Sequence, residues 1–145
     1  MAELEAFAPK EDWNVSGLIQ LFRGAGYAVQ VVGDENVVVD IEEEGVFAGR
    51  VVVLLEGTSL GFRVLYTFKD HLSREEKLEF VNRLNTHAKL PRFAVLEAHL
   101  DVLMIDYYFP TSVGLTAPQI LTVFRRFIQE TGLQLIMNDG IKFLA

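Results

Sequence analysis

The sequence predicts an α+β protein in which helices pack on one face of an antiparallel β-sheet. Its apolar residues repeat with a helical period near both ends and once in the middle, and with a period of two in between. The resulting order is helix, four strands, helix, two strands, helix. Only short turns separate the first four strands, so the long crossovers of a parallel sheet are absent.

A chain of 145 residues has the usual size of one domain. We therefore expect a single domain over residues 1–145, with an N-terminal arm over 1–11 and a C-terminal extension over 133–145. The first helix should begin after this arm, with Asp12 as its N-cap and Gly24 or Gly26 at its end. Its apolar residues at helical spacing are Val15, Leu18, Ile19 and Phe22.

Four strands should follow, because the period changes to two from Tyr27 onward. The stretches are residues 27–32, 37–43, 49–57 and 59–68. A turn-rich GDEN segment separates the first two, and a turn from Gly57 to Ser59 separates the last two. Successive strands joined in this way predict an antiparallel meander.

The second helix should start at Ser73, which forms a capping box with Glu76. We expect Pro91 to prevent it from continuing. Its predicted apolar stripe is Leu78, Val81, Leu84 and Ala88. Two further strands are expected over residues 92–100 and 102–109, with a turn near residues 99–101.

The last helix repeats the same start signal, with Thr116 as N-cap, Gln119 three residues later and Pro118 in the first turn. Gly132 is the expected C-terminal end. Residues 133–145 alternate weakly around an Asn-Asp-Gly turn. They could form a strand, a small hairpin or an ordered tail.

The alternation assigns the strand residues to two faces of the sheet. The face expected to carry the helices contains Val37, Val39, Ile41, Val51, Val53, Leu55, Phe62, Val64, Tyr66, Phe68, Phe93, Val95, Leu103, Ile105, Tyr107 and Phe109. The opposite parity contains Val38, Asp40, Val52, Leu54, Arg63, Leu65, Thr67, Ala94, Leu96, Val102, Met104, Asp106 and Tyr108. This second face is more apolar than a solvated sheet surface should be.

An interface would explain the apolar second face. The candidates for contact with a partner or a second copy are Val38, Val52, Leu54, Leu65, Leu96, Met104 and Tyr108. Coverage by the C-terminal tail, or a local exchange of faces at a bulge, would explain it as well.

Composition excludes several classes of protein. The chain has no cysteine, so disulfides, thiolate metal sites and cysteine nucleophiles are ruled out. Its net charge of −7 opposes direct binding of nucleic acid. No apolar run is long enough to span a membrane and the N-terminus is acidic, so we expect a cytoplasmic protein without membrane contact.

No catalytic, cofactor-binding or metal-binding pattern stands out. The three histidines form no recognised metal spacing, and His99 with Asp101 and Asp106 is read as a set of solvated strand-end residues. The serines lack a GxSxG elbow, and the GAG segment follows a helix. We therefore expect a non-enzymatic protein without cofactor or metal.

Several segments resemble the YbjN family of small bacterial proteins, which are candidate regulators of sensory transduction. The similarity spans about residues 13–132 and is strongest over 76–127, in FVNRLN, the strand at Phe93, DYYFP and GLTAPQILTVFRRF. It implies the fold of type III secretion chaperones, which are commonly dimeric, acidic and protein-binding. Asn82 and Asn85 are then interpreted as architectural residues whose side-chain amides hold neighbouring backbone. A partner contact is the alternative.

The sequence thus predicts a chaperone-like adaptor or regulator that binds another protein and acts as a homodimer. The alternative is a sensory module that binds a small apolar ligand between sheet and helices.

Overall fold

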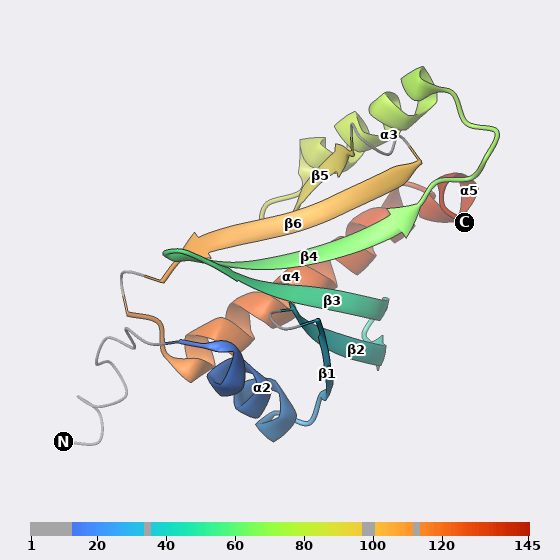
Figure 1. Ribbon diagram of the computed structural model, residues 1–145. Helices are drawn as coiled ribbons and strands as arrows, with labels where there is room; N and C mark the ends of the chain where they lie inside the picture. The colour runs from blue at the N-terminus through green and yellow to red at the C-terminus, as the bar shows by residue number, and fades with distance from the viewer. Residues whose placement is uncertain (1–12, 34–35, 97–100, 112–113) are drawn as a thin grey trace.

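The computed structural model describes residues 13–33, 36–96, 101–111 and 114–145. Its elements are α2 (Val15–Gly24), β1 (Ala28–Val32), β2 (Asn36–Glu44), β3 (Phe47–Glu56), β4 (Ser59–Thr67), α3 (Arg74–His87), β5 (Arg92–Val95), β6 (Val102–Pro110), α4 (Ala117–Met137) and α5 (Gly140–Phe143). The strands form one six-stranded sheet in the order β1-β2-β3-β4-β6-β5, and every pairing is antiparallel. The predicted α+β class is confirmed (Figure 1).

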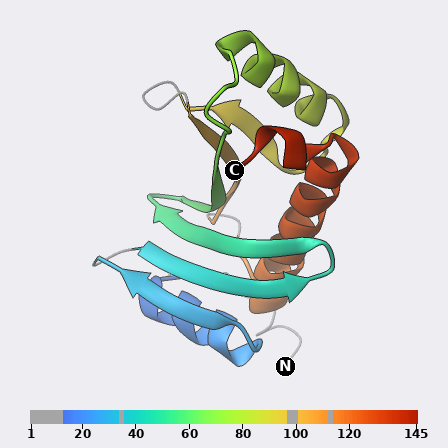
Figure 2. The same cartoon turned by 90° about the vertical axis from the view of Figure 1, so that its right-hand side faces the viewer.

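Helices α2 and α4 lie on the same side of the sheet (Figures 1 and 2). Phe62 of β4 contacts Phe124 in an edge-to-face pair with ring centroids 5.2 Å apart, and Phe22 of α2 reaches the same ring at 4.8 Å. The sheet face expected to carry the helices does so, and most of its residues are buried in the core. Leu55, Tyr66, Val95 and Tyr107 are its half-buried members.

The N-cap of α2 is Asn14, whose Oδ1 accepts a hydrogen bond from the Gly17 amide at 2.7 Å. The expected cap, Asp12, lies outside the described residues. The helix ends at Gly24, one of the two expected ends, and Gly26 then takes a positive φ of 94° at the turn into β1. Both capping boxes, at Ser73 with Glu76 and at Thr116 with Gln119, form as predicted.

Helix α3 packs on the core largely with the predicted stripe, because Val81 and Leu84 are buried and Ala88 packs against the core, but Leu78 does not belong to it. Leu78 is 41 % exposed, whereas Phe80, which was left out of the stripe, is fully buried. The Phe80 ring stacks on Phe143 of α5 at 4.3 Å and meets Phe68 edge-on at 6.4 Å. The buried face of α3 therefore includes the side that meets the C-terminal segment. The sequence did not indicate the position of that segment.

The expected end of the last helix at Gly132 is wrong, because α4 continues to Met137. Gly132 is buried where α4 crosses the turn between β2 and β3. A Cβ at this position would lie 2.9 Å from Val46 Cγ2 and 3.1 Å from the Val46 backbone. The glycine therefore allows close packing and does not terminate the helix.

The C-terminal segment is neither a strand nor a hairpin. Asp139 adopts the left-handed conformation, with φ of 57°, and joins α4 to the short helix α5. Leu144 then forms an isolated bridge with Phe68, and the Ala145 amide donates to the Thr67 carbonyl at 2.8 Å. The segment thus lies along the end of β4, beyond the point where β4 leaves β3.

Candidate interaction surface

The second face of the sheet is covered by none of the described helices, and Figure 1 looks onto it. We call the part of this surface on β3, β4, β6 and β5 the open face. Ladder pairing places Val52, Arg63, Asp106 and Arg92 in one row across these strands, Leu54, Gly61 and Tyr108 in the next row, and Leu65, Met104 and Ala94 in a third.

Most of the predicted contact candidates share this surface. Leu65 is 52 % exposed, and the half-buried candidates are Val52, Leu54, Leu96, Met104 and Tyr108. Val38 lies on the same side but is only 7 % exposed, so its side chain offers little area to a partner. The C-terminal tail does not cover this face, because it packs against Phe68 and α3 on the helix side.

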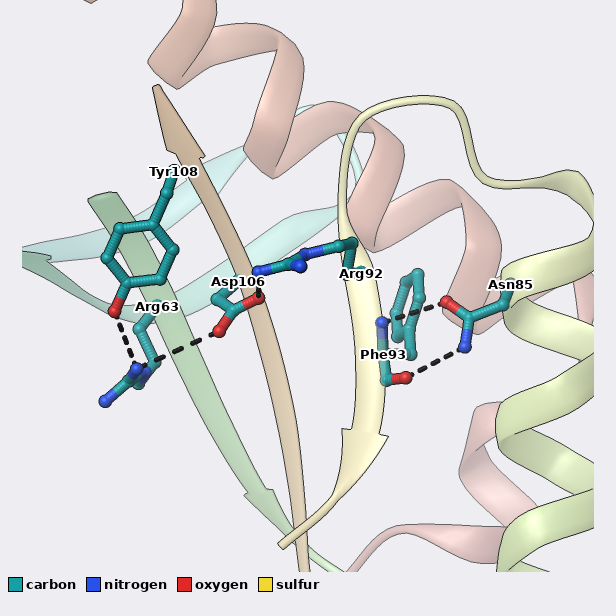
Figure 3. Close-up of polar contacts among 6 residues, drawn as sticks. All are labelled: Arg63, Asn85, Arg92, Phe93, Asp106 and Tyr108. Atoms are coloured by element: carbon teal, nitrogen blue, oxygen red, sulfur yellow. Dashed lines mark hydrogen bonds and ion pairs between the residues drawn. The ribbon is translucent and has the colours of Figure 1, made fainter. Parts of the chain in front are cut away.

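A charged cluster lies at the centre of the open face (Figure 3). Asp106 of β6 sits between Arg92 of β5, with Nη2 to Oδ1 at 3.3 Å, and Arg63 of β4, with Nη2 to Oδ2 at 3.8 Å. Asp106 is only 6 % exposed although no helix covers it, because the neighbouring side chains shield it. Within this trio the two guanidinium groups exceed the carboxylate by one positive charge, and a further carboxylate, Glu56 of β3, acts on the cluster through Tyr108.

Tyr108 completes this cluster. Arg63 Nη2 donates to the Tyr108 hydroxyl at 2.7 Å, and the guanidinium lies 5.9 Å from the ring centroid. The ring lies over Gly61 of the adjacent strand, where any Cβ would overlap it. Burial raises the pKa of Tyr108, and the positive charge of Arg63 partly opposes this shift. Only a glycine at position 61 lets the ring lie flat on the sheet.

The parity of the strand residues placed Arg63 and Asp106 on this face but did not show that the two side chains meet. The signal was present, because opposite charges of the same parity on strands that pair are expected to meet across the ladder. The pairing of β4 with β6 skips α3 and β5 in the chain, so the partners could not be aligned beforehand. The interpretation of Asp106 as a solvated strand-end residue is wrong, because it is buried within β6 and paired with two arginines. His99, which was grouped with it, lies outside the described residues.

Asn85 of α3 shields the β5 edge of the sheet (Figure 3). Its Nδ2 donates to the Phe93 carbonyl at 2.8 Å, and its Oδ1 accepts from the Phe93 amide at 3.0 Å. Both outward backbone groups of Phe93 are thereby satisfied, and another strand cannot pair there. Asn82 is exposed, and its side chain makes no hydrogen bond within the described part of the chain.

Replacing Asn85 with alanine should lower the free energy of unfolding by about 1–2 kcal/mol, since two hydrogen bonds are lost at a site that water can partly reach. Asn82→Ala in the same helix is the matched control and should stay within about 0.5 kcal/mol. Urea titrations of both variants measure the difference. Equal stability of the two variants would contradict the edge-shielding role of Asn85.

The C-terminal segment builds a second candidate site, which the sequence did not indicate. A half-open pocket of about 540 Å³ is lined by Tyr66, Leu135, Ile136, Asp139, Gly140, Ile141, Leu144 and Ala145. Large apolar side chains are exposed at and beside it: Ile141 is 83 %, Met137 69 % and Ile136 59 % exposed. The pocket lies between the helix-side end of β4 and the helices α4 and α5.

Tyr66 makes one wall of this pocket, and its pKa is raised by burial. Because the folded protein favours the neutral phenol, Tyr66 contributes full stability below the unfolded pKa of about 10 and loses it as pH rises above that value. Melting temperatures measured from about pH 8 to about pH 11 should therefore fall more steeply for the wild type than for Tyr66→Phe. Parallel curves would show that Tyr66 ionises as freely as in the unfolded chain.

Among the residues that the structure describes, no three His, Asp or Glu side chains come together to hold a metal ion. In the same residues, no helix is long and apolar enough to cross a membrane.

The sheet with one helix-covered face, one open face and one shielded edge defines a small antiparallel α+β domain. Among solved structures this fold is shared with YbjN from E. coli, a candidate transcription regulator, with a TM-score of 0.74, 10 % sequence identity and coverage of 92 % of this chain and 96 % of YbjN. An uncharacterized protein from Methanothermobacter thermautotrophicus matches with a TM-score of 0.58, 14 % identity and coverage of 86 % and 96 %.

No protein-family model matches the chain, and no curated protein is similar to it in sequence. At this level of identity the structural matches establish the fold alone. The expected resemblance to YbjN is confirmed in that sense. The relation to type III secretion chaperones stays a prediction.

Proposed function

We propose that this protein is a non-enzymatic regulator or adaptor that binds another protein through the open face and acts as a homodimer. The observation that carries the proposal is a sheet surface that combines exposed apolar side chains with a fixed charged centre. Regulation is also the role suggested for YbjN, which has the same fold.

The geometry of the open face suits a protein partner better than a small molecule. A hollow of about 410 Å³ between α3 and the sheet, lined by Asn85, Arg92, Phe93, Ala94, Met104 and Asp106, is open to solvent and continues into the rest of the face. Small ligands are usually enclosed on most sides, whereas protein interfaces are broad and nearly flat.

The charged cluster defines the chemistry that the partner should present. Arg63 and Arg92 are held by one carboxylate between them, and the Arg63 Nε is buried without a hydrogen-bond partner among the described residues. A partner that places a carboxylate over the arginines and apolar side chains over Leu65 and Met104 would satisfy both parts of the surface.

Affinity capture from the native cell extract, followed by identification of the retained proteins, tests the proposal. Three baits are compared: the wild type, Leu65→Asp on the open face, and Val46→Asp, which replaces a valine of similar exposure on the β2–β3 turn. We expect one protein retained by the wild type and by Val46→Asp but lost from Leu65→Asp. Retention of the same proteins by all three baits would contradict binding through the open face.

The C-terminal pocket supports a second candidate function, the binding of a small apolar ligand. Its volume of about 540 Å³ lies in the range of ordinary ligand sites. Solvent extraction of the purified protein followed by mass spectrometry would detect such a ligand. A compound present in stoichiometric amount in the wild type, and absent from a Leu144→Asp variant that still folds, would favour this function.

A further inference from the structure

The two edges of the sheet differ in how they are protected. At the β5 edge, the amide of Asn85 occupies the outward backbone groups of Phe93. At the other edge, β1 pairs only with β2. Unpaired edge strands attract other strands, so natural proteins normally block them with lysine, proline, a bulge or a covering segment. The sequence of β1, AVQVV, contains neither lysine nor proline, and its pairing with β2 is regular.

The backbone of β1 has free hydrogen-bonding groups on its outer side. Antiparallel ladders alternate, so every second residue of an edge strand directs its N–H and C=O outward. Arg23 Nη2 donates to the Val29 carbonyl at 3.1 Å, which shows that Val29, and with it Val31, faces outward. In the described residues, the Val29 amide and both backbone groups of Val31 have no other partner on this side.

The side chains at this edge are apolar and accessible. Val31 is 43 % and Val32 54 % exposed, while Val29 is buried under α2. No side chain of β1 itself is charged, whereas Arg23 of α2 contacts the outer edge at the Val29 carbonyl and would have to move aside or share that carbonyl when a second strand pairs.

We propose that β1 pairs in antiparallel fashion with β1 of a second copy, around a two-fold axis through Gln30. This inference rests on the homodimer of the proposed function and assigns it an interface. Val29 of each copy would lie opposite Val31 of the other, and each pair would exchange both of its hydrogen bonds. The Val29 carbonyl has a second lone pair for this bond beside the one that Arg23 uses.

Self-complementarity is the reason to assign a second copy to this edge. Val29 and Val31 both direct their N–H and C=O groups outward. When two copies are related by a two-fold axis, each N–H of one strand therefore meets a C=O of the other strand. The exposed Val31 would then cover Val29 on the helix side, and the open faces of both copies would remain free for their partner.

The interface would be small, because β1 has only five residues. Such an area is below that of a standard stable interface, so we expect a reversible dimer whose average mass falls on dilution.

Sedimentation equilibrium of the full 16.3 kDa chain over a range of concentrations tests the pairing. Val31→Lys places a charge opposite the partner's Val29 and should raise the dimer dissociation constant by at least about tenfold. Val46→Lys, at a valine of similar exposure, should leave the constant unchanged, because Val46 lies beyond the end of β2 opposite to Val37, the residue that pairs with Val31. A Val31→Lys protein that dimerises like the wild type would overturn the proposal.

Hydrogen exchange of the wild type gives a second test that needs no variant. Pairing predicts that the amides of Val29 and Val31 become more protected as protein concentration rises, and unchanged exchange in a sample that dimerises would overturn it.

The variant Leu65→Asp distinguishes dimerisation through the β1 edge from dimerisation through the open face. If this variant loses the dimer while Val31→Lys keeps it, the copies meet at the open face and the edge assignment fails. A wild type that stays monomeric overturns the dimer but leaves partner capture through the open face as a separate result.

Discussion

Replacing Phe80 with alanine is expected to lower the free energy of unfolding by about 3–5 kcal/mol, as for other fully buried phenylalanines. The ring is completely buried and contacts Phe68, the residue after β4, and Phe143 of α5. Its loss would leave a cavity where α3, the end of β4 and the C-terminal segment meet. Because whole domains are typically stable by only about 5–15 kcal/mol, this variant should be close to unfolding at 37 °C.

Leu78→Ala in the same helix is the control. Leu78 is 41 % exposed, so its truncation should change the free energy of unfolding by less than about 0.5 kcal/mol. Chemical denaturation of both variants distinguishes the observed packing of α3 from the stripe that the sequence predicted. A larger loss at Leu78 than at Phe80 would mean that α3 is rotated relative to this structure.

The elements that depend on local signals were predictable from the sequence. Two capping boxes fixed the starts of α3 and α4, because the N-cap side chain and the residue three positions later satisfy each other's backbone amides. Alternation of apolar residues fixed the face of each strand, including the row of Val37, Val39 and Ile41 in β2.

Features that depend on contacts between distant segments were not predictable. Gly132 was taken as a helix end, but it is required by the close approach of Val46 from another hairpin. The burial of Phe80 depends on α5, which follows in the chain only after β5, β6 and the whole of α4. The same applies to the charged cluster, since Arg63 and Asp106 become neighbours only when β6 adds beside β4.

The largest expected effect on binding follows from placing a carboxylate on the open face at Leu54, Leu65 or Met104. In an interface, an unpaired charge must lose its water without gaining a partner, which costs several kcal/mol. A second negative charge would also repel the carboxylate that Arg63 and Arg92 are proposed to bind. We therefore expect at least about 100-fold weaker partner binding for Leu65→Asp.

The effect on folding should differ among the three positions. Leu65 is 52 % exposed, so its replacement should leave the melting temperature nearly unchanged, whereas Leu54 and Met104 are half-buried and should lose some stability. Leu65→Asp is thus the variant in which loss of binding is separated from loss of fold.

Calorimetric titration of the captured partner into the wild type, Leu65→Asp and Val46→Asp is the most direct test of binding through the open face. We expect equal dissociation constants for the wild type and Val46→Asp, and a constant at least about 100-fold higher for Leu65→Asp at an unchanged melting temperature. Dissociation constants that agree within about twofold for all three proteins would contradict it, because the open face would then not contact the partner.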